Sequence, residues 1–156
     1  AAPLFADRLR ADGAGKDTVL VGPDSESRQW VEAVAKPLGL DVLIGEKMRR
    51  GDRGGDIELP GREQAAGRPA VIIDDVVSTG ATLVQCARQL TGAGAARIEV
   101  LAVHALWGDD DERLLRAAGI SRLRSTDSIP HASNAIPLAS LIAEALRAGL
   151  LPKGRT

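Results

Sequence analysis

The segment VIIDDVVSTGAT, residues 71–82, constrains the fold and the chemistry of this 156-residue chain more than any other feature. Apolar residues at 70–73 predict a buried strand, and the acidic pair Asp74 and Asp75 follows them directly. Five small or hydroxyl-bearing residues then lead into a predicted helix: Ser78, Thr79, Gly80, Ala81 and Thr82. Because ligands bind at the carboxyl ends of strands in open α/β sheets, the segment predicts a binding site at such an edge.

The residue types in this segment suit a sugar phosphate. Adjacent carboxylates such as Asp74 and Asp75 repel each other, so a cation or the vicinal hydroxyls of a ribose would satisfy them. Small residues let backbone N–H groups approach a phosphate, and a helix N-terminus contributes the positive end of its dipole. The alternative is a strand followed by a helix that Ser78 or Thr79 caps, which explains the hydroxyls but leaves the paired acids without a role.

Short apolar runs alternate with helical patterns along the rest of the chain. The β-type runs cover residues 18–21, 41–44, 70–74, 98–103 and 121–125, and the helical patterns cover 25–38, 81–91, 110–118 and 137–148. Such alternation predicts one α/β domain over residues 1–156, with a mostly parallel sheet flanked by helices on both faces. The polar, glycine-rich stretch 47–67 interrupts it; we predict a flexible hairpin or flap there, with a plain solvated loop as the alternative.

The composition narrows the environment and the partners. The formal net charge of −1 gives no general attraction to nucleic acid or to an anionic membrane. No apolar run approaches the roughly 18–20 residues that a membrane-spanning helix needs, and we expect no signal peptide at the first residues. The single cysteine, Cys86, fits a reducing, cytoplasmic compartment, and its place in a predicted helix favours a core residue over a nucleophile.

The segment 71–82 resembles the signature of type I phosphoribosyltransferase folds, in which apolar residues precede two acids and a Thr-Gly-type loop. Transferases share this motif with phosphoribosyl diphosphate synthetases, so the motif leaves both classes open. The segment VLVGPDSESRQW, residues 19–30, is similar to the Pro-Asp loop of the synthetases. That resemblance makes Asp24 the implied Mg²⁺ ligand, although Ser25 could simply cap a helix that begins there.

A second segment, EKMRRGDR at residues 46–53, resembles the flexible catalytic loop of the synthetases. Their Lys-X-Arg pair falls on Lys47 and Arg49, and alternate residues of an extended segment project to the same side. Both cations could therefore point at one ligand and neutralise charge on a transferred phosphoryl group. The alternative is a solvated basic turn.

The resemblance implies the C-terminal half of a ribose-phosphate diphosphokinase, with the N-terminal half and much of the ATP site absent from these 156 residues. It implies transfer of diphosphate from Mg-ATP to the anomeric hydroxyl of ribose 5-phosphate, which yields phosphoribosyl diphosphate and AMP. Asp74 and Asp75 would orient the ribose hydroxyls, and residues 78–82 would hold the 5-phosphate. Lys47 and Arg49 would stabilise the transferred diphosphate, and the full-length protein would form a homo-oligomer.

Two other functions stay open at this point. A purine or pyrimidine phosphoribosyltransferase would need a base-binding hood, but Phe5, Trp30 and Trp107 are the only aromatic residues and none falls in an evident hood. A non-catalytic regulatory homologue would keep the fold without the reaction, which the retained acids and basic residues disfavour. Ser78 stands where many relatives have Asp, so we expect phosphate binding to survive and anion regulation to differ.

Overall fold

The structure, a computed structural model, describes residues 1–48 and 56–149 and is built on a six-stranded sheet. All its strand pairs are parallel, in the order β2-β1-β5-β6-β7-β8. The strands are β1 (Val19–Gly22), β2 (Asp41–Ile44), β5 (Pro69–Val77), β6 (Arg97–Ala105), β7 (Ile120–Thr126) and β8 (Asn134–Ile136). The parallel α/β architecture predicted from the alternating pattern is therefore confirmed.

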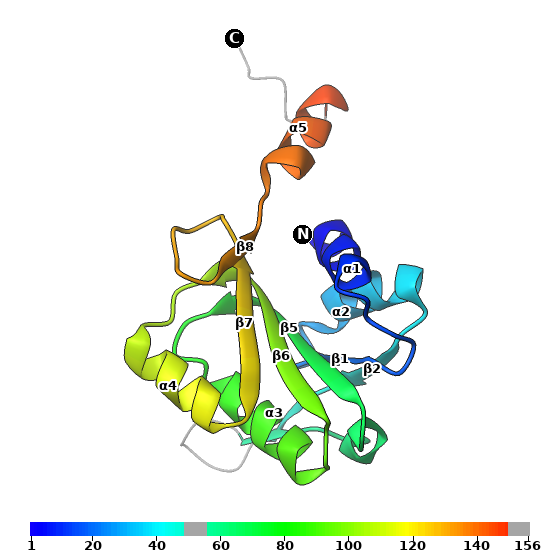
Figure 1. Ribbon diagram of the computed structural model, residues 1–156, viewed down its shortest axis with the longest axis vertical. Helices are drawn as coiled ribbons and strands as arrows, with labels where there is room; N and C mark the ends of the chain where they lie inside the picture. The colour runs from blue at the N-terminus through cyan, green and yellow to red at the C-terminus, as the bar shows by residue number, and fades with distance from the viewer. Residues whose placement is uncertain (49–55, 150–156) are drawn as a thin grey trace.

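Helices cover both faces of the sheet, as Figure 1 shows. On one face lie α1 (Ala2–Ala11) and α2 (Arg28–Ala35), and on the other lie α3 (Ala81–Gly92) and α4 (Asp109–Ala117). Side chains along the strands alternate between two cores, so that Ile72 packs in the α3–α4 core while Ile73 packs in the α1–α2 core. Burial on both faces explains why the strands read as continuous apolar runs.

The remaining helices are short or peripheral. Two 3₁₀ turns, η1 (Lys36–Leu38) and η2 (Arg62–Ala65), follow α2 and precede β5. Helix α5 (Ala139–Arg147) extends beyond the edge of the sheet, and none of its side chains is buried (Figure 1). Within residues 1–48 and 56–149, every helix is too short or too polar to span a bilayer.

The structure departs from the sequence pattern most clearly at the start of α2, at the end of β5 and in strand β8. Helix α2 begins at Arg28 rather than at residue 25, because the Asp24 carboxylate accepts hydrogen bonds from the N–H groups of Glu26 and Ser27, both at 3.1 Å, and holds a turn there. Strand β5 continues past the acidic pair because its pairing with β6 continues to Val77. The short strand β8 has no apolar run and was not predicted.

The polar stretch after β2 forms a hairpin at its base. Strand β3 (Glu46–Met48) pairs antiparallel with β4 (Asp56–Glu58), and residues 49–55 lie outside the described structure. The returning arm is part of the core, because Ile57 and Leu59 are only 6% and 0% exposed. The hairpin is thus confirmed at its base, whereas its flexibility stays a prediction.

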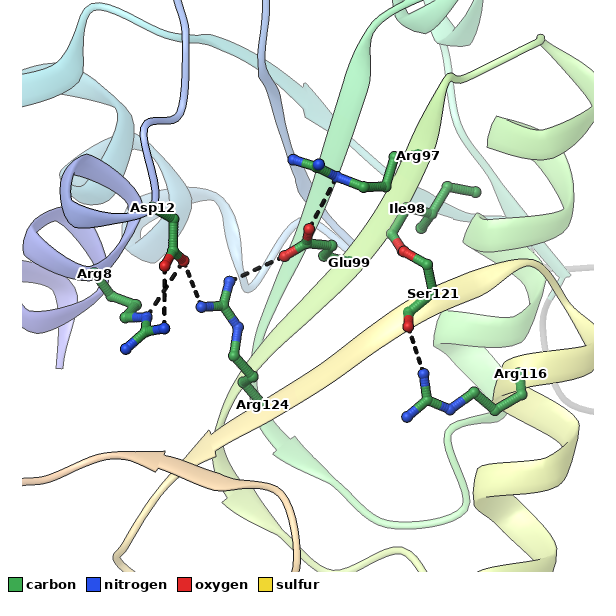
Figure 2. A network of polar contacts seen from close by, with 8 residues as sticks. All are labelled: Arg8, Asp12, Arg97, Ile98, Glu99, Arg116, Ser121 and Arg124. Atoms are coloured by element: carbon green, nitrogen blue, oxygen red, sulfur yellow. Dashed lines mark hydrogen bonds and ion pairs between the residues drawn. The ribbon is translucent and has the colours of Figure 1, made fainter.

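A charged network ties the end of α1 to the sheet (Figure 2). Arg124 of β7, only 5% exposed, donates to the Glu99 carboxylate at 3.0 Å and also to the Asp12 carboxylate. Arg97 and Arg8 contact the same two acids from the outside, at 2.9 and 3.0 Å. Each buried charge therefore has an opposite partner, and this attraction offsets part of the cost of removing the two charges from water.

Candidate functional site

The candidate site lies at the carboxyl edge of the two neighbouring parallel strands β1 and β5. The loop after β1 carries Asp24, and the last part of β5 carries Asp74 and Asp75. Side chains from α1, α2, β5, β6 and this loop line a cavity of about 80 Å³: Phe5, Asp24, Glu26, Ser27, Trp30, Ile73, Asp74, Asp75 and Val103. The fold thus brings together acids that are fifty residues apart in the sequence.

Asp24 and Lys47 form an ion pair at the mouth of this site, with 2.8 Å between Lys47 Nζ and Asp24 Oδ2. The contact depends on a close approach of two loops, because the Gly45 N–H donates to the Gly22 carbonyl at 2.8 Å. A side chain at Gly45 would collide with the Pro23 carbonyl oxygen, 2.3 Å from the position of its Cβ. Glycine at this position therefore lets β3 begin beside the Pro-Asp loop.

The charges of this pair stabilise each other. Burial by itself would raise the pKa of Asp24, but the hydrogen bond and charge of Lys47 and the N–H groups of Ser27 and Glu26 outweigh burial and lower it. The hydrogen bond and charge of Asp24 raise the pKa of Lys47 in turn. Asp24 is consequently ionised and positioned to hold a cation.

The adjacent acids differ in environment. Asp74 is largely buried, and this burial raises the pKa of its carboxyl group to about 7, with further contributions from the charges of Asp75 and Asp24. The Asp74 carboxylate accepts the Asp75 N–H at 3.0 Å, and the exposed Asp75 carboxylate accepts the Val76 N–H at 2.7 Å. Two carboxylates held this way lack a cationic partner at hydrogen-bond distance among the described side chains, which is the environment that ribose hydroxyls would complete.

The loop between β5 and α3 forms a second, small cavity of about 70 Å³, lined by Asp74 and by residues 76–83. Gly80 is the N-cap of α3 and has φ of +69°, a conformation that glycine adopts without strain. The Thr79 hydroxyl accepts only the Ala81 N–H, at a long 3.4 Å, and no side chain caps the helix. Gly80, and not Ser78 or Thr79, is therefore the N-cap of α3, and apart from the Ala81 N–H the first N–H groups of the helix stay available to an anion.

Asp74 lines both cavities, so the two cavities adjoin at this residue. A ligand with a phosphate in the loop and hydroxyls over the acid pair would extend toward Asp24 and Lys47. Of the residues that the sequence predicted for the site, Arg49 lies outside the described residues. The others lie along this edge.

Two residues in the wall of the cavity that holds Asp24 are not among the site residues predicted from the sequence. Trp30 of α2, with 43% of its surface exposed, and Glu26 line the same cavity as Asp24 and Asp74. The sequence did hold a signal for Trp30, because this residue lies only six positions after Asp24, within about two helical turns.

Cys86 is fully buried, and burial raises the pKa of its thiol to about 12, which confirms it as a core residue.

Comparison with known proteins gives the family. Residues 2–146 match the model of the phosphoribosyl transferase domain. Among curated relatives, ribose-phosphate pyrophosphokinase 2 of Archaeoglobus fulgidus is 37% identical over 131 residues, which cover 84% of this chain and 48% of the relative. The ribose-phosphate pyrophosphokinase of Methanopyrus kandleri is 32% identical over 85% of this chain and 45% of its own length.

Solved structures agree on the fold. The phosphoribosylpyrophosphate synthetase of Mycobacterium smegmatis superposes with a TM-score of 0.79 at 23% identity, covering 96% of this chain and 50% of that one. The adenine phosphoribosyltransferase of Saccharomyces cerevisiae superposes with a TM-score of 0.62 at 19% identity, covering 80% and 76%. The chain spans about half the length of the curated relatives it matches. With a family match over residues 2–146, the chain belongs to the phosphoribosyl transferase domain family.

Proposed function

We propose that this chain carries the ribose 5-phosphate half of a ribose-phosphate diphosphokinase, which transfers diphosphate from Mg-ATP to the anomeric hydroxyl of ribose 5-phosphate. The observation that carries the proposal is the position of Asp74. It lines both the cavity of the loop at residues 78–82, called the phosphate loop from here on, and the cavity that holds Asp24. A sugar phosphate can occupy both cavities, with its phosphate in the loop cavity and its hydroxyls against the acid pair. Curated relatives named ribose-phosphate pyrophosphokinases support the choice.

Each part of the site has a role in this proposal. Ser78, Thr79, Gly80, Ala81 and Thr82 hold the 5-phosphate through hydroxyls and backbone N–H groups. Asp74 and Asp75 accept hydrogen bonds from the ribose hydroxyls and so orient the anomeric oxygen. Lys47 lies beside Asp24, where it neutralises charge on the diphosphate as the bond to the anomeric oxygen forms and AMP leaves. Arg49, outside the described residues, would add a second cation from the same hairpin.

Magnesium fits the donor set at this position. Asp24 offers an ionised carboxylate, and among residues 1–48 and 56–149 no three acidic, histidine or cysteine side chains are arranged so that they could hold a metal ion by themselves. Mg²⁺ is commonly held by one or two carboxylates, substrate phosphates and water, rather than by a full protein cage. Bound there with Asp24, it would offset the negative charge of the diphosphate.

The complete reaction requires partners beyond these residues. Because the chain covers about half of its curated relatives, we propose that ATP binding and homo-oligomer formation involve a longer protein. A cytoplasmic location is supported only by the single buried cysteine, Cys86. The 156 residues alone are expected to bind ribose 5-phosphate and phosphoribosyl diphosphate and to release no AMP from ATP.

A purine or pyrimidine phosphoribosyltransferase is the second candidate, favoured by the structural likeness to adenine phosphoribosyltransferase. That activity would appear as base-dependent release of diphosphate from phosphoribosyl diphosphate. A panel of free purines and pyrimidines tests it, and diphosphate release with any of them would replace the diphosphokinase proposal.

Calorimetric titration with ribose 5-phosphate tests the site itself. The wild-type chain should bind ribose 5-phosphate more tightly than ribose or inorganic phosphate, because only the sugar phosphate occupies the loop and the acid pair together. The double variant Asp74→Asn, Asp75→Asn should lose this preference while its circular dichroism spectrum stays unchanged. Absence of binding by a folded wild-type chain would count against the assignment.

A further inference from the structure

Two glutamine side chains of α3 bind the backbone of β4 and of Leu59, the residue that follows it. Gln85 Oε1 accepts the Ile57 N–H at 2.7 Å, and Gln89 Oε1 accepts the Leu59 N–H at 2.9 Å. Gln89 Nε2 also donates to the Ile57 carbonyl oxygen at 2.8 Å. Gln85 and Gln89 are four residues apart on one face of α3, so their amides take the place of a neighbouring strand along β4.

The other edge of β4 pairs with β3. Residues along an antiparallel strand direct their backbone groups alternately to one side and the other. Ile57 and Leu59 direct theirs toward α3, so Asp56 and Glu58 face β3, where they pair with Met48 and Glu46. Strand β4 is therefore held between α3 and β3, and the residue opposite Ile57 in the register is Lys47.

Helix α3 forms one end of the candidate site and is linked to the other end through β4 and β3. Its N-terminus, at Gly80, forms the phosphate loop. Gln85 and Gln89 lie roughly 7.5 and 13.5 Å further along the same helix, at ~1.5 Å per residue. A helix is stiff over this length. The hydrogen bonds of Gln85 and Gln89 fix β4 relative to α3, and the pairing of β4 with β3 fixes Lys47 in turn. The distance between Lys47 and the phosphate loop is thereby set.

We infer that Gln85 and Gln89 are positioning residues that hold Lys47 at the diphosphate end of the ligand, at a set distance from the phosphate loop. This inference rests on the proposed function, because it takes Lys47 as the diphosphate contact. The buried side chains of Ile57 and Leu59 keep β4 attached to the core without the glutamines. The hydrogen bonds from the glutamine side chains also orient the backbone of β4. They thereby orient β3, the paired strand that carries Lys47.

Binding measurements with two ligands test the inference. In the double variant Gln85→Met, Gln89→Met, which conserves side-chain length, affinity for phosphoribosyl diphosphate with Mg²⁺ should fall about tenfold, as a loss of ~1.4 kcal/mol produces. Affinity for ribose 5-phosphate, which lacks the diphosphate, should stay unchanged. Amide hydrogen exchange should accelerate at Ile57 and Leu59 and at residues 46–48 of β3.

A matched pair and a double-mutant cycle separate positioning from general stability. Gln85→Glu keeps an oxygen acceptor for the Ile57 N–H and should behave like the wild type, whereas Gln85→Met should not. In a Lys47→Ala background, the glutamine substitutions should cause no further loss of phosphoribosyl diphosphate affinity, because their effect passes through Lys47.

Three results would overturn the inference: additive losses in the cycle, an equal fall for both ligands, or unchanged phosphoribosyl diphosphate affinity despite faster exchange. If the wild type binds neither ligand, the proposed function fails as well, and that outcome differs visibly from a failure confined to the glutamine variants.

Discussion

Replacing Asp74 by Asn should make the protein more stable while it destroys the sugar-phosphate site. Burial raises the pKa of Asp74 from 3.8 to about 7, so the folded state keeps the proton that the unfolded chain releases. The stability associated with this proton is fully present below pH 3.8 and is lost as the pH rises to about 7. At ~1.4 kcal/mol per pH unit, the ionised carboxylate costs the folded protein about 4 kcal/mol above pH 7.

Asn carries no charge at any of these pH values, and its side-chain oxygen can still accept the Asp75 N–H. Urea unfolding followed by circular dichroism should therefore show Asp74→Asn to be about 4 kcal/mol more stable than the wild type at pH 8. The difference should shrink steadily below pH 7 and nearly vanish at pH 4. Asp75→Asn, at the exposed neighbour, is the control and should change stability much less.

A variant that is no more stable than the wild type at pH 8 would refute this reasoning, as would a gain that does not depend on pH. The first result would mean that water or a cation solvates the Asp74 carboxylate more than its burial indicates, and the second that the gain does not come from the charge of Asp74. The expected result, in contrast, would show that the Asp74 charge lowers the stability of the fold but is needed for binding, since the same variant should no longer bind ribose 5-phosphate.

Three further outcomes follow from the structure. Gly80→Ala should destabilise the protein by about 1–3 kcal/mol in urea unfolding, because Gly80 has φ of +69° and its Cβ would lie 2.8 Å from a leucine side chain of α4. Arg124→Met should cost roughly 3–5 kcal/mol, since it leaves the buried Glu99 carboxylate without that partner, whereas Arg97→Met, at an exposed guanidinium, should cost less than about 1 kcal/mol. Equal costs for the two arginine variants would contradict the network. Ribose 5-phosphate should change the fluorescence of Trp30 in the acid-lined cavity, and Trp30→Phe should abolish the signal without abolishing calorimetric binding.

Much of the fold was predictable because the relevant signals are local. Apolar runs alternating with helical patterns predicted a parallel sheet with helices on both faces, since a strand buried on two sides must be apolar throughout. The boundaries were less predictable. The start of α2 depends on the Asp24 side chain, and the end of β5 depends on pairing with β6, a strand more than twenty residues away.

The candidate site divides in the same way. The sequence alone determined its local part: an acid pair, small residues and a helix start are contiguous in residues 71–82, so their chemistry could be recognised without a fold. Only the tertiary structure decided that Lys47 meets Asp24, that Gln85 and Gln89 bind β4, and that Asp74 is buried enough for its pKa to reach about 7. Contacts between distant segments, and exclusion of water from a carboxylate, depend on how the chain packs, and no stretch of sequence contains that information by itself.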